Sequence, residues 1–369
     1  MDLINLGMKV ICYPALILFF LSSVMLLGQG RVEDFALSKG DLIEDLLFDY
    51  YDEKNFNGAV LVVENNKVIY ENTFGFADFE NEEPLDRSTP FYLASLAKQF
   101  TAAAIVKLAE DGQLSLDDPL RKYLPLMPKL YDSVKIRHLL THTSGVPDYF
   151  YLNINKDGLT NLDVYKGLIE QRNLDFTPGN KYKYSNSGYV LLAMVIQVAS
   201  GQTIDNYFNE NIFKPFHMEN SFVCSALSVE RPRVKGYTAK NKLYDYNLLT
   251  VGDGGIYATS NDMYKWQQAL NNGSFISAES LKKIYEPVVL TNGRQRNYGF
   301  GWEIGSNMQG KLVYHTGGLA GFRTYIERQI ETNNAIIIFT NNSFTGILDL
   351  RNTLVKILDE RYPLTEEIE

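Results

Sequence analysis

Hydrophobic and polar positions follow two different periods along the chain. Two β-rich runs within GAVLVVENNKVIYENTFG flank Asn65-Asn66, and this arrangement predicts a β-hairpin. Strand patterns return only after Val251, where short alternating or apolar runs are bounded by Gly and Asn. The predicted strands there are YGFGWEI, KLVYHTGG, FRTYIERQI and NAIIIFTN.

Helical spacing is found between these strand regions and on both sides of them. An amphipathic helix is predicted where Leu42, Ile43, Leu46, Leu47 and Tyr50 recur among acidic residues. Apolar helices are predicted in FYLASLAKQFTAAAIVKLAEDG, with Gly112 as its stop, in SNSGYVLLAMVIQVASG, closed by Gly201, and in TIDNYFNENIF. The amphipathic run GILDLRNTLVKILDERY predicts a helix near the C-terminus.

This order of elements predicts an α+β fold. Since strands come from both ends of the chain, we expect one central, mostly antiparallel sheet built from both termini and flanked by helices, including the first and the last. Residues 31–97 and 250–369 are expected to form this α/β sheet domain, and residues 98–249 a mainly helical insertion domain.

The N-terminal segment has the pattern of an export signal. Lys9 precedes an apolar run from Val10 to Leu27, and Gly28-Gln29-Gly30 has small residues where a signal peptidase would cut after Gly30. We therefore expect residues 1–30 to be a signal peptide of a periplasmic or extracellular protein. The alternative is a retained membrane anchor, because the run is 18 residues long.

Composition and charge exclude some classes of function. The 369 residues carry a net charge of -9, which argues against nucleic acid or anionic membrane surfaces as partners. Only Cys12 and Cys224 are present, so removal of the signal would leave one cysteine and no internal disulfide.

A candidate nucleophile lies at the start of the first apolar helix. Ser95 and Lys98 are three residues apart and therefore share a helix face. Such spacings are common by chance, and a serine at a helix start is usually an N-cap. The chemical interpretation is that a desolvated lysine beside a hydroxyl can lose its proton near neutral pH and activate the hydroxyl as a nucleophile.

Two further stretches could complete such a site. In KYKYSNSGY, Tyr184 could act as a general base if a cation such as Lys98 lies nearby, and Asn186 could hold Lys98 and a substrate amide. In HTGG, residues 315–318, the glycines would let a substrate backbone approach a strand. Taken alone, KYKYSNSGY is equally typical of a helix cap with a packed tyrosine, and HTGG of a plain turn after an edge strand.

In combination and in this order, SLAK, YSN and HTGG resemble the motifs of the serine β-lactamase and penicillin-recognising family, in particular its class C-like branch. IRHLLTHTSGVPD, GGIYATSNDMYKW and YGFGW also resemble recurring stretches of this family. The resemblance implies a β-lactamase/transpeptidase-like fold in which the two expected domains form one catalytic unit.

The resemblance also implies roles for individual residues. Ser95 would be acylated, Lys98 and Tyr184 would share the base and acid duties, and Asn186 would orient the substrate. His315, Thr316, Gly317 and Gly318 would form the substrate-binding strand, and the backbone N–H groups of Ser95 and Gly318 would form the oxyanion hole. His315 departs from the lysine of the lactamase motif, and a neutral histidine grips a carboxylate poorly.

We therefore expect a secreted serine hydrolase acting on an amide or ester, more like a peptidase or esterase than an efficient resistance enzyme. The alternatives are a class C-type β-lactamase or penicillin-binding DD-carboxypeptidase, and a weakly catalytic relative that binds cell-wall peptides. Expected partners are small molecules or short peptides, with cell-wall fragments among the candidates. Membrane contact is expected only if the N-terminal segment is retained. An α/β-hydrolase would need a G-x-S-x-G string, which the sequence lacks.

No cofactor or metal is expected. His138 and His142 are four residues apart and could pair on a helix, but HLLTH lacks the glutamate of a zinc protease and no third ligand is evident.

Overall fold

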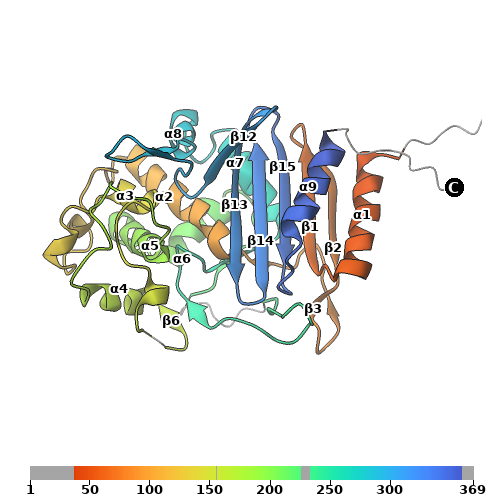
Figure 1. Ribbon diagram of the computed structural model, residues 1–369, viewed down its shortest axis with the longest axis horizontal. Helices are drawn as coiled ribbons and strands as arrows, with labels where there is room; N and C mark the ends of the chain where they lie inside the picture. Colours follow the sequence, from red (N-terminus) through yellow and green to blue (C-terminus); the bar gives the residue numbers. More distant parts are fainter. Residues whose placement is uncertain (1–36, 155, 226–232, 360–369) are drawn as a thin grey trace, which may run out of the picture. The chain divides into compact units, whose positions relative to one another are not determined.

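The central sheet has six strands, all paired antiparallel, and both ends of the chain contribute to it (Figure 1). In spatial order the strands are β12 (Glu303–Asn307), β13 (Gly310–Leu319), β14 (Phe322–Gln329), β15 (Asn334–Thr340), β1 (Gly58–Glu64) and β2 (Lys67–Phe74). Strand β1 pairs with β15 in the register Gly58 to Thr340. The expected α+β fold with a sheet from both ends is confirmed.

The structure is a computed structural model that describes residues 37–154, 156–225 and 233–359. The elements named here belong to one unit within Lys39–Pro363. The predicted signal segment lies outside the described residues, and the predicted domain boundaries stay a prediction.

Nine helices occur among the described residues: α1 (Lys39–Lys54), α2 (Lys98–Glu110), α3 (Ile136–Leu140), α4 (Asn161–Ile169), α5 (Asn186–Ser200), α6 (Ile204–Phe208), α7 (Ser260–Asn271), α8 (Ala278–Ile284) and α9 (Ile347–Leu358). Short 3-10 turns are η1 (Ala94–Ala97), η2 (Leu120–Lys122), η3 (Lys129–Tyr131) and η4 (Tyr149–Tyr151), and one π-helical turn, η5 (Asn209–Phe213), continues α6. The remaining short strands are β3 (Phe76–Asp78), β4 (Glu83–Pro84), β5 (Phe91–Tyr92), β6 (Leu159–Thr160), β7 (Phe222–Val223), β8 (Leu248–Leu249), β9 (Ile256–Ala258), β10 (Val288–Val289) and β11 (Gln295–Arg296).

The two faces of the sheet have separate cores. Helices α1 and α9 lie side by side on one face, where Leu47 and Leu354 pack against Val60 and Ile338. The other face packs against η1, α2 and α7 in a second, larger cluster. The first and last described helices therefore flank the sheet, as predicted, and both lie on the same face.

Local signals account for where several elements begin and end. Asn65 and Asn66 have φ angles of 48° and 65°, which suits the tight turn of the β1–β2 hairpin. The Ser185 hydroxyl accepts a hydrogen bond from the backbone N–H of Gly188 at the start of α5, and Gly201 ends α5 in the left-handed conformation.

Two predicted elements are shorter than expected. Most of residues 91–112 was expected to form the first apolar helix, but β5, Leu93 and η1 precede it and α2 begins only at Lys98. The predicted strand YGFGWEI begins only at Glu303, because Gly301 has a φ of +75° and Gly299 presses against the Ile284 carbonyl.

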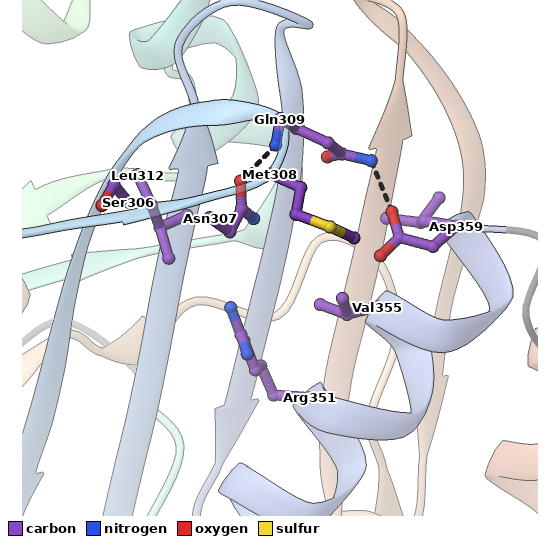
Figure 2. Close-up of a pocket in the computed structure, with 9 residues that line it drawn as sticks. Ser306, Asn307, Met308, Gln309, Leu312, Arg351, Val355 and Asp359 are labelled. Carbon is purple, nitrogen blue, oxygen red and sulfur yellow. Dashed lines mark hydrogen bonds between the residues drawn. The ribbon is translucent and has the colours of Figure 1, made fainter.

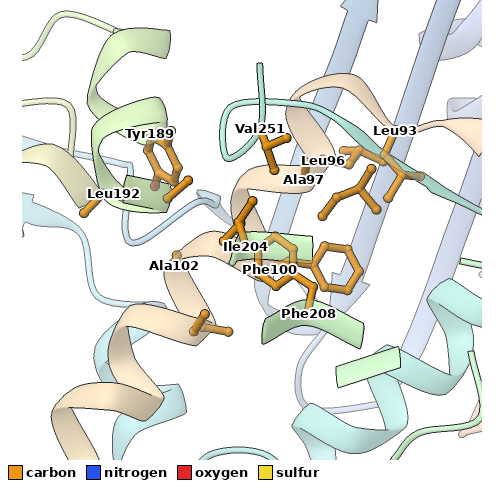
Figure 3. Packing of buried hydrophobic residues seen from close by; sticks show 14 of the residues in the cluster. Leu93, Leu96, Ala97, Phe100, Ala102, Tyr189, Leu192, Ile204, Phe208 and Val251 are labelled. Atoms are coloured by element: carbon orange, nitrogen blue, oxygen red, sulfur yellow. The ribbon is translucent and has the colours of Figure 1, made fainter. Parts of the chain in front are cut away.

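Helix α2 is buried along nearly its whole length, as its alanine-rich sequence predicted. Figure 3 shows Phe100 of α2 among Leu96, Ile204 and Phe208. Phe100 also stacks on Trp266 of α7, with ring centroids 4.8 Å apart. Burial of one such side chain contributes about 1.5–3 kcal/mol, so this packing fixes the helix that begins at Lys98.

Candidate active site

Ser95 lies in the η1 turn, and hydrogen bonds from two other segments hold the residue before this turn in place. The backbone N–H of Leu93 donates to the carbonyl of Ile256 at 2.9 Å, and the Thr324 hydroxyl donates to the Leu93 carbonyl at 2.9 Å. Ala94, just before Ser95, has a φ of +49°, a left-handed conformation that costs a non-glycine residue about 1–2 kcal/mol. The surrounding structure therefore enforces a sharp turn directly before the predicted nucleophile.

Lys98 is fully buried, and its amine contacts three oxygen atoms. Its Nζ is 3.0 Å from Ser95 Oγ, 2.9 Å from Asn186 Oδ1 and 2.8 Å from the Asp253 backbone oxygen. The amide and backbone oxygens can only accept, whereas the Ser95 hydroxyl can donate or accept. An ammonium can donate to all three, and a neutral amine can donate to two and accept from Ser95. Both protonation states are therefore satisfied in one geometry.

Burial lowers the pKa of the Lys98 amine to about 8, and the carboxylates of Asp253 and Asp148 oppose this shift. Asp148 accepts from the backbone N–H and the side-chain amide of Asn186 at 2.5 and 3.0 Å. The Asp253 carboxylate accepts from the Tyr149 hydroxyl at 2.8 Å. Burial also raises the pKa of the Asp253 carboxyl. Lys98 therefore titrates close to neutral pH in direct contact with Ser95.

Tyr184 lies beside this pair. Lys98 Nζ is 4.9 Å from the centroid of its ring, and its hydroxyl is buried without a hydrogen-bond partner among the described side chains and backbone. Burial raises the pKa of the Tyr184 phenol well above its ordinary value, while the nearby Ser95 side chain lowers it. The phenol is therefore protonated at neutral pH and can donate a proton.

Strand β13 alternates between buried and exposed residues at the predicted motif. His315 and Gly317 are buried, whereas Thr316 and Gly318 are exposed. A Cβ on Gly317 would lie 2.2 Å from Thr324 Oγ1 and 2.6 Å from the Leu93 oxygen, so this glycine is needed for packing against the turn before Ser95. A Cβ on Gly318 would meet nothing closer than 3.6 Å. Of the two glycines expected to admit substrate, only Gly318 borders open space.

Among the described strands, none pairs with the outer edge of β13 where these residues lie. Strand β12 pairs with β13 from Gly310 to Tyr314. Beyond Tyr314, the described partner of β13 is β14. An unpaired strand edge offers backbone N–H and C=O groups to an extended ligand.

His315 is held by the protein through both ring nitrogens. Its Nε2 is 3.1 Å from the Tyr298 hydroxyl and its Nδ1 is 2.6 Å from the Thr316 backbone oxygen. Burial, and then the charge of Lys98, lower the pKa of the His315 imidazole to about 4. Both ring nitrogens of His315 are therefore engaged within the protein, and its place in the substrate-binding strand stays a prediction.

The His138–His142 pair does not form a metal-binding arrangement. Nδ1 of His138 accepts from the backbone N–H of Lys135 and Nδ1 of His142 accepts from that of Ser185, each at 3.1 Å. No cluster of three or more metal-binding side chains occurs in the part of the chain that the structure describes. The imidazoles instead hold backbone groups in place.

A cavity of about 660 Å³ lies between the β12–β13 hairpin and α9, with Met308 and Arg351 in its wall (Figure 2). Ser95, Lys98 and Tyr184 do not line it, so we do not assign it to the chemistry. Cys224 is buried, as a small apolar residue would be.

Within residues 37–359, apart from the undescribed gaps, no single helix has the length and hydropathy of a membrane span, and Asn186–Ser200 with Ile204–Phe213 reach them only as a pair bent by 79°.

The structure brings Ser95, Lys98, Tyr184 and Asn186 together and places the HTGG strand against the turn before Ser95. Sequence reasoning missed Asp148 and Asp253, the two carboxylates that act on Lys98. Asp148 ends the family-like stretch THTSGVPD and Asp253 directly precedes GGIYATSNDMYKW, but the resemblance gave neither acid a role.

Comparisons with known proteins agree with this geometry. The Beta-lactamase family model matches residues 43–359. Penicillin-binding protein 4* of Bacillus subtilis (strain 168) is 36% identical over 80% of this chain and 70% of its own length. D-aminopeptidase of Brucella anthropi is 29% identical over 73% of this chain and 53% of its own length.

Among solved structures, the octameric penicillin-binding protein homologue from Pyrococcus abyssi is similar with a TM-score of 0.75 and 26% identity, covering 86% of this chain and 77% of that one. The family match, the relatives and the fold all agree, and the chain belongs to the Beta-lactamase family of serine hydrolases.

Proposed function

We propose that this protein forms an acyl-enzyme at Ser95 and hydrolyses an amide or ester, as a peptidase or esterase rather than as an efficient resistance enzyme. The observation that carries the proposal is the 3.0 Å contact between Ser95 Oγ and the buried Lys98 amine. A lysine whose pKa is near 8 is partly neutral at physiological pH and can act as a base.

The reaction follows from these contacts. Neutral Lys98 takes the Ser95 proton while Oγ attacks the substrate carbonyl carbon, and the carbonyl electron pair moves onto its oxygen. The backbone N–H groups of Ser95 and Gly318 are assigned to that oxyanion, where loss of one donor typically costs about 3 kcal/mol. When the intermediate collapses, the leaving group departs with a proton from Tyr184, which Lys98 reprotonates. Water then attacks the acyl carbonyl carbon, and Tyr184 takes a proton from it while passing its own proton to neutral Lys98. The bond between Ser95 Oγ and the acyl carbon breaks, Lys98 returns the proton to Oγ, and the acid product leaves.

The preference against β-lactam antibiotics rests on His315. A buried neutral imidazole with both nitrogens engaged supplies no cation for a substrate carboxylate. The relative named D-aminopeptidase supports an amide substrate, with short peptides as candidates. A class C-type β-lactamase or DD-carboxypeptidase is the second candidate, favoured by the similarity to penicillin-binding protein 4*.

Intact-mass measurement after incubation with a nitrophenyl ester and with a fluorescent penicillin tests the proposal. We expect one added acyl group on the wild type and on Ser88→Ala, whose serine is exposed and lies outside the site. No addition is expected on Ser95→Ala. If no ester, amide or lactam acylates the wild type, or if Ser95→Ala is labelled equally, the proposal fails and the peptide-binding alternative gains support.

We further propose that residues 1–30 direct export and are removed. N-terminal sequencing of the protein from an exporting bacterial host should then begin at Arg31. A protein that keeps residues 10–27 and fractionates with the membrane would instead be an anchored enzyme.

A further inference from the structure

Three buried side chains, His142, Tyr298 and His315, are joined by hydrogen bonds. His142 Nε2 is 3.1 Å from the Tyr298 hydroxyl, and this hydroxyl is 3.1 Å from His315 Nε2. This series of hydrogen bonds ends on backbone groups at both sides. The N–H of Ser185 donates to His142 Nδ1, and His315 Nδ1 contacts the Thr316 oxygen at 2.6 Å. All three side chains are at most 4% exposed.

The two backbone ends fix the position of every proton in this series of hydrogen bonds. Since the Ser185 N–H can only donate, His142 Nδ1 carries no proton and Nε2 carries the ring proton. Nε2 therefore donates to Tyr298, and Tyr298 donates to His315 Nε2. His315 must then carry its proton on Nδ1, where the Thr316 oxygen can only accept. Both imidazoles are neutral in this arrangement.

The electrostatic surroundings agree with neutral rings. Burial and then the Lys98 charge lower the pKa of both His142 and His315. The other titratable groups that contact His142 are the rings of Tyr182, Tyr184 and Tyr189. No carboxylate appears among the contacts of either imidazole in the described part of the chain.

These hydrogen-bonded side chains connect two parts of the proposed site, the segment that carries Tyr184 and strand β13. At one end, His142 binds the backbone directly after Tyr184, and its ring lies 4.2 Å from the Tyr184 ring. At the other end, His315 belongs to β13, two residues before Gly317. His142 also has a φ of +55°, an uncommon conformation for a residue other than glycine.

We infer that His142, Tyr298 and His315 act as positioning residues, a bridge that sets the spacing between the Tyr184–Asn186 segment and the β13 edge on either side of Ser95. The inference rests on the acyl-enzyme chemistry proposed above and assigns a role to THTSG and YGFGW, which the sequence left without one. The bridge is complete only when both imidazoles are neutral and carry the protons assigned above.

Tyr298→Phe removes the central hydroxyl and keeps the ring. Tyr131→Phe is the matched control, because Tyr131 is fully buried and donates to the Leu168 carbonyl at 3.0 Å in another part of the fold. We expect Tyr298→Phe to lower the acylation rate at saturating nitrophenyl ester at least tenfold, with KM within about twofold, and Tyr131→Phe to retain the wild-type rate. Equal rates in the two variants would overturn the inference.

His142→Asn is the second variant, because asparagine tolerates a positive φ and can still accept from Ser185, while it cannot reach Tyr298. Either substitution alone interrupts the same bridge. The acylation rate of the double variant His142→Asn/Tyr298→Phe should therefore be no lower than that of the slower single variant. Multiplied losses would show that the two residues act separately and would overturn the bridge.

Nitrogen-15 NMR of the four histidines tests the bridge without any activity. We expect the ring assigned to His142 by substitution to be neutral and protonated on Nε2 at pH 7, and the ring assigned to His315 to be neutral and protonated on Nδ1. A cationic or Nε2-protonated His315 would overturn the bridge. Failure of the wild type to be acylated would refute the proposed function while leaving this spectrum as an independent result.

Discussion

The pH dependence of acylation follows from the environment of Lys98. If neutral Lys98 accepts the Ser95 proton, the rate must rise as pH increases through the pKa of the amine. With that pKa at about 8, roughly one amine in eleven is neutral at pH 7, one half at pH 8 and ten in eleven at pH 9. Acylation should therefore become about fivefold faster from pH 7 to 8 and about tenfold faster from pH 7 to 9.

Rapid quenching followed by intact-mass measurement reads this dependence directly. A nitrophenyl ester is the suitable substrate because its leaving group needs no proton, so the profile reports the base alone. Circular dichroism at each pH controls for unfolding. A flat profile between pH 6 and 9.5, or a rise centred near the ordinary lysine pKa of about 10.4, would refute Lys98 as the base.

Asp253→Asn should move the rising part of the profile to lower pH. The Asp253 carboxylate is the charge that most strongly opposes the fall in the pKa of Lys98, so removing it lets that pKa fall further. Asp262→Asn is the matched control, because this buried carboxylate contacts Ser221 and Lys265 and does not act on Lys98. A shift of equal size in both variants would refute the assignment.

The remaining predictions concern the same candidate active site. Lys98→Ala should abolish acylation while the circular dichroism spectrum stays native, and wild-type rates in this variant would contradict it. His315→Lys would place a second buried cation near Lys98 and break the contact with Tyr298, so we expect slower acylation by every substrate. Faster acylation by carboxylate-bearing β-lactams would instead show that a cation is tolerated at this position. Gly317→Ala should destabilise the fold by about 1–3 kcal/mol in urea unfolding, whereas Gly318→Ala should change it by less than about 0.5 kcal/mol; equal effects would refute the packing role of Gly317.

Local signals explain which parts of the fold could be predicted. The turn at Asn65-Asn66 and the stop at Gly201 depend on backbone conformations that these residue types favour, so the hairpin and the end of α5 followed from sequence. The turn at Ala94 could not be predicted, because alanine has no preference for a positive φ and the contacts with Ile256 and Thr324 impose it.

The contacts of the site can also be separated into those that could be predicted from sequence and those that could not. The meeting of Lys98 with Ser95 and Asn186 was expected from the motif resemblance. The Asp253 backbone oxygen on Lys98 was not, because any residue type supplies a carbonyl and only the path of the chain brings it there. Tyr298 was predicted to lie in a strand, but it lies in a loop before β12. The neighbouring glycines of this loop approach other backbone segments closely, and such tertiary contacts cannot be predicted from sequence.

The pairing of β1 with β15 has a consequence for synthesis. A ribosome makes Gly58–Glu64 long before the partner strand Asn334–Thr340. The edge of β1 that faces β15 must therefore wait without its partner until that strand is made, a delay that exposes it to aggregation. A premature stop codon before Asn334 would leave every proposed reacting side chain in the product and still yield no enzyme.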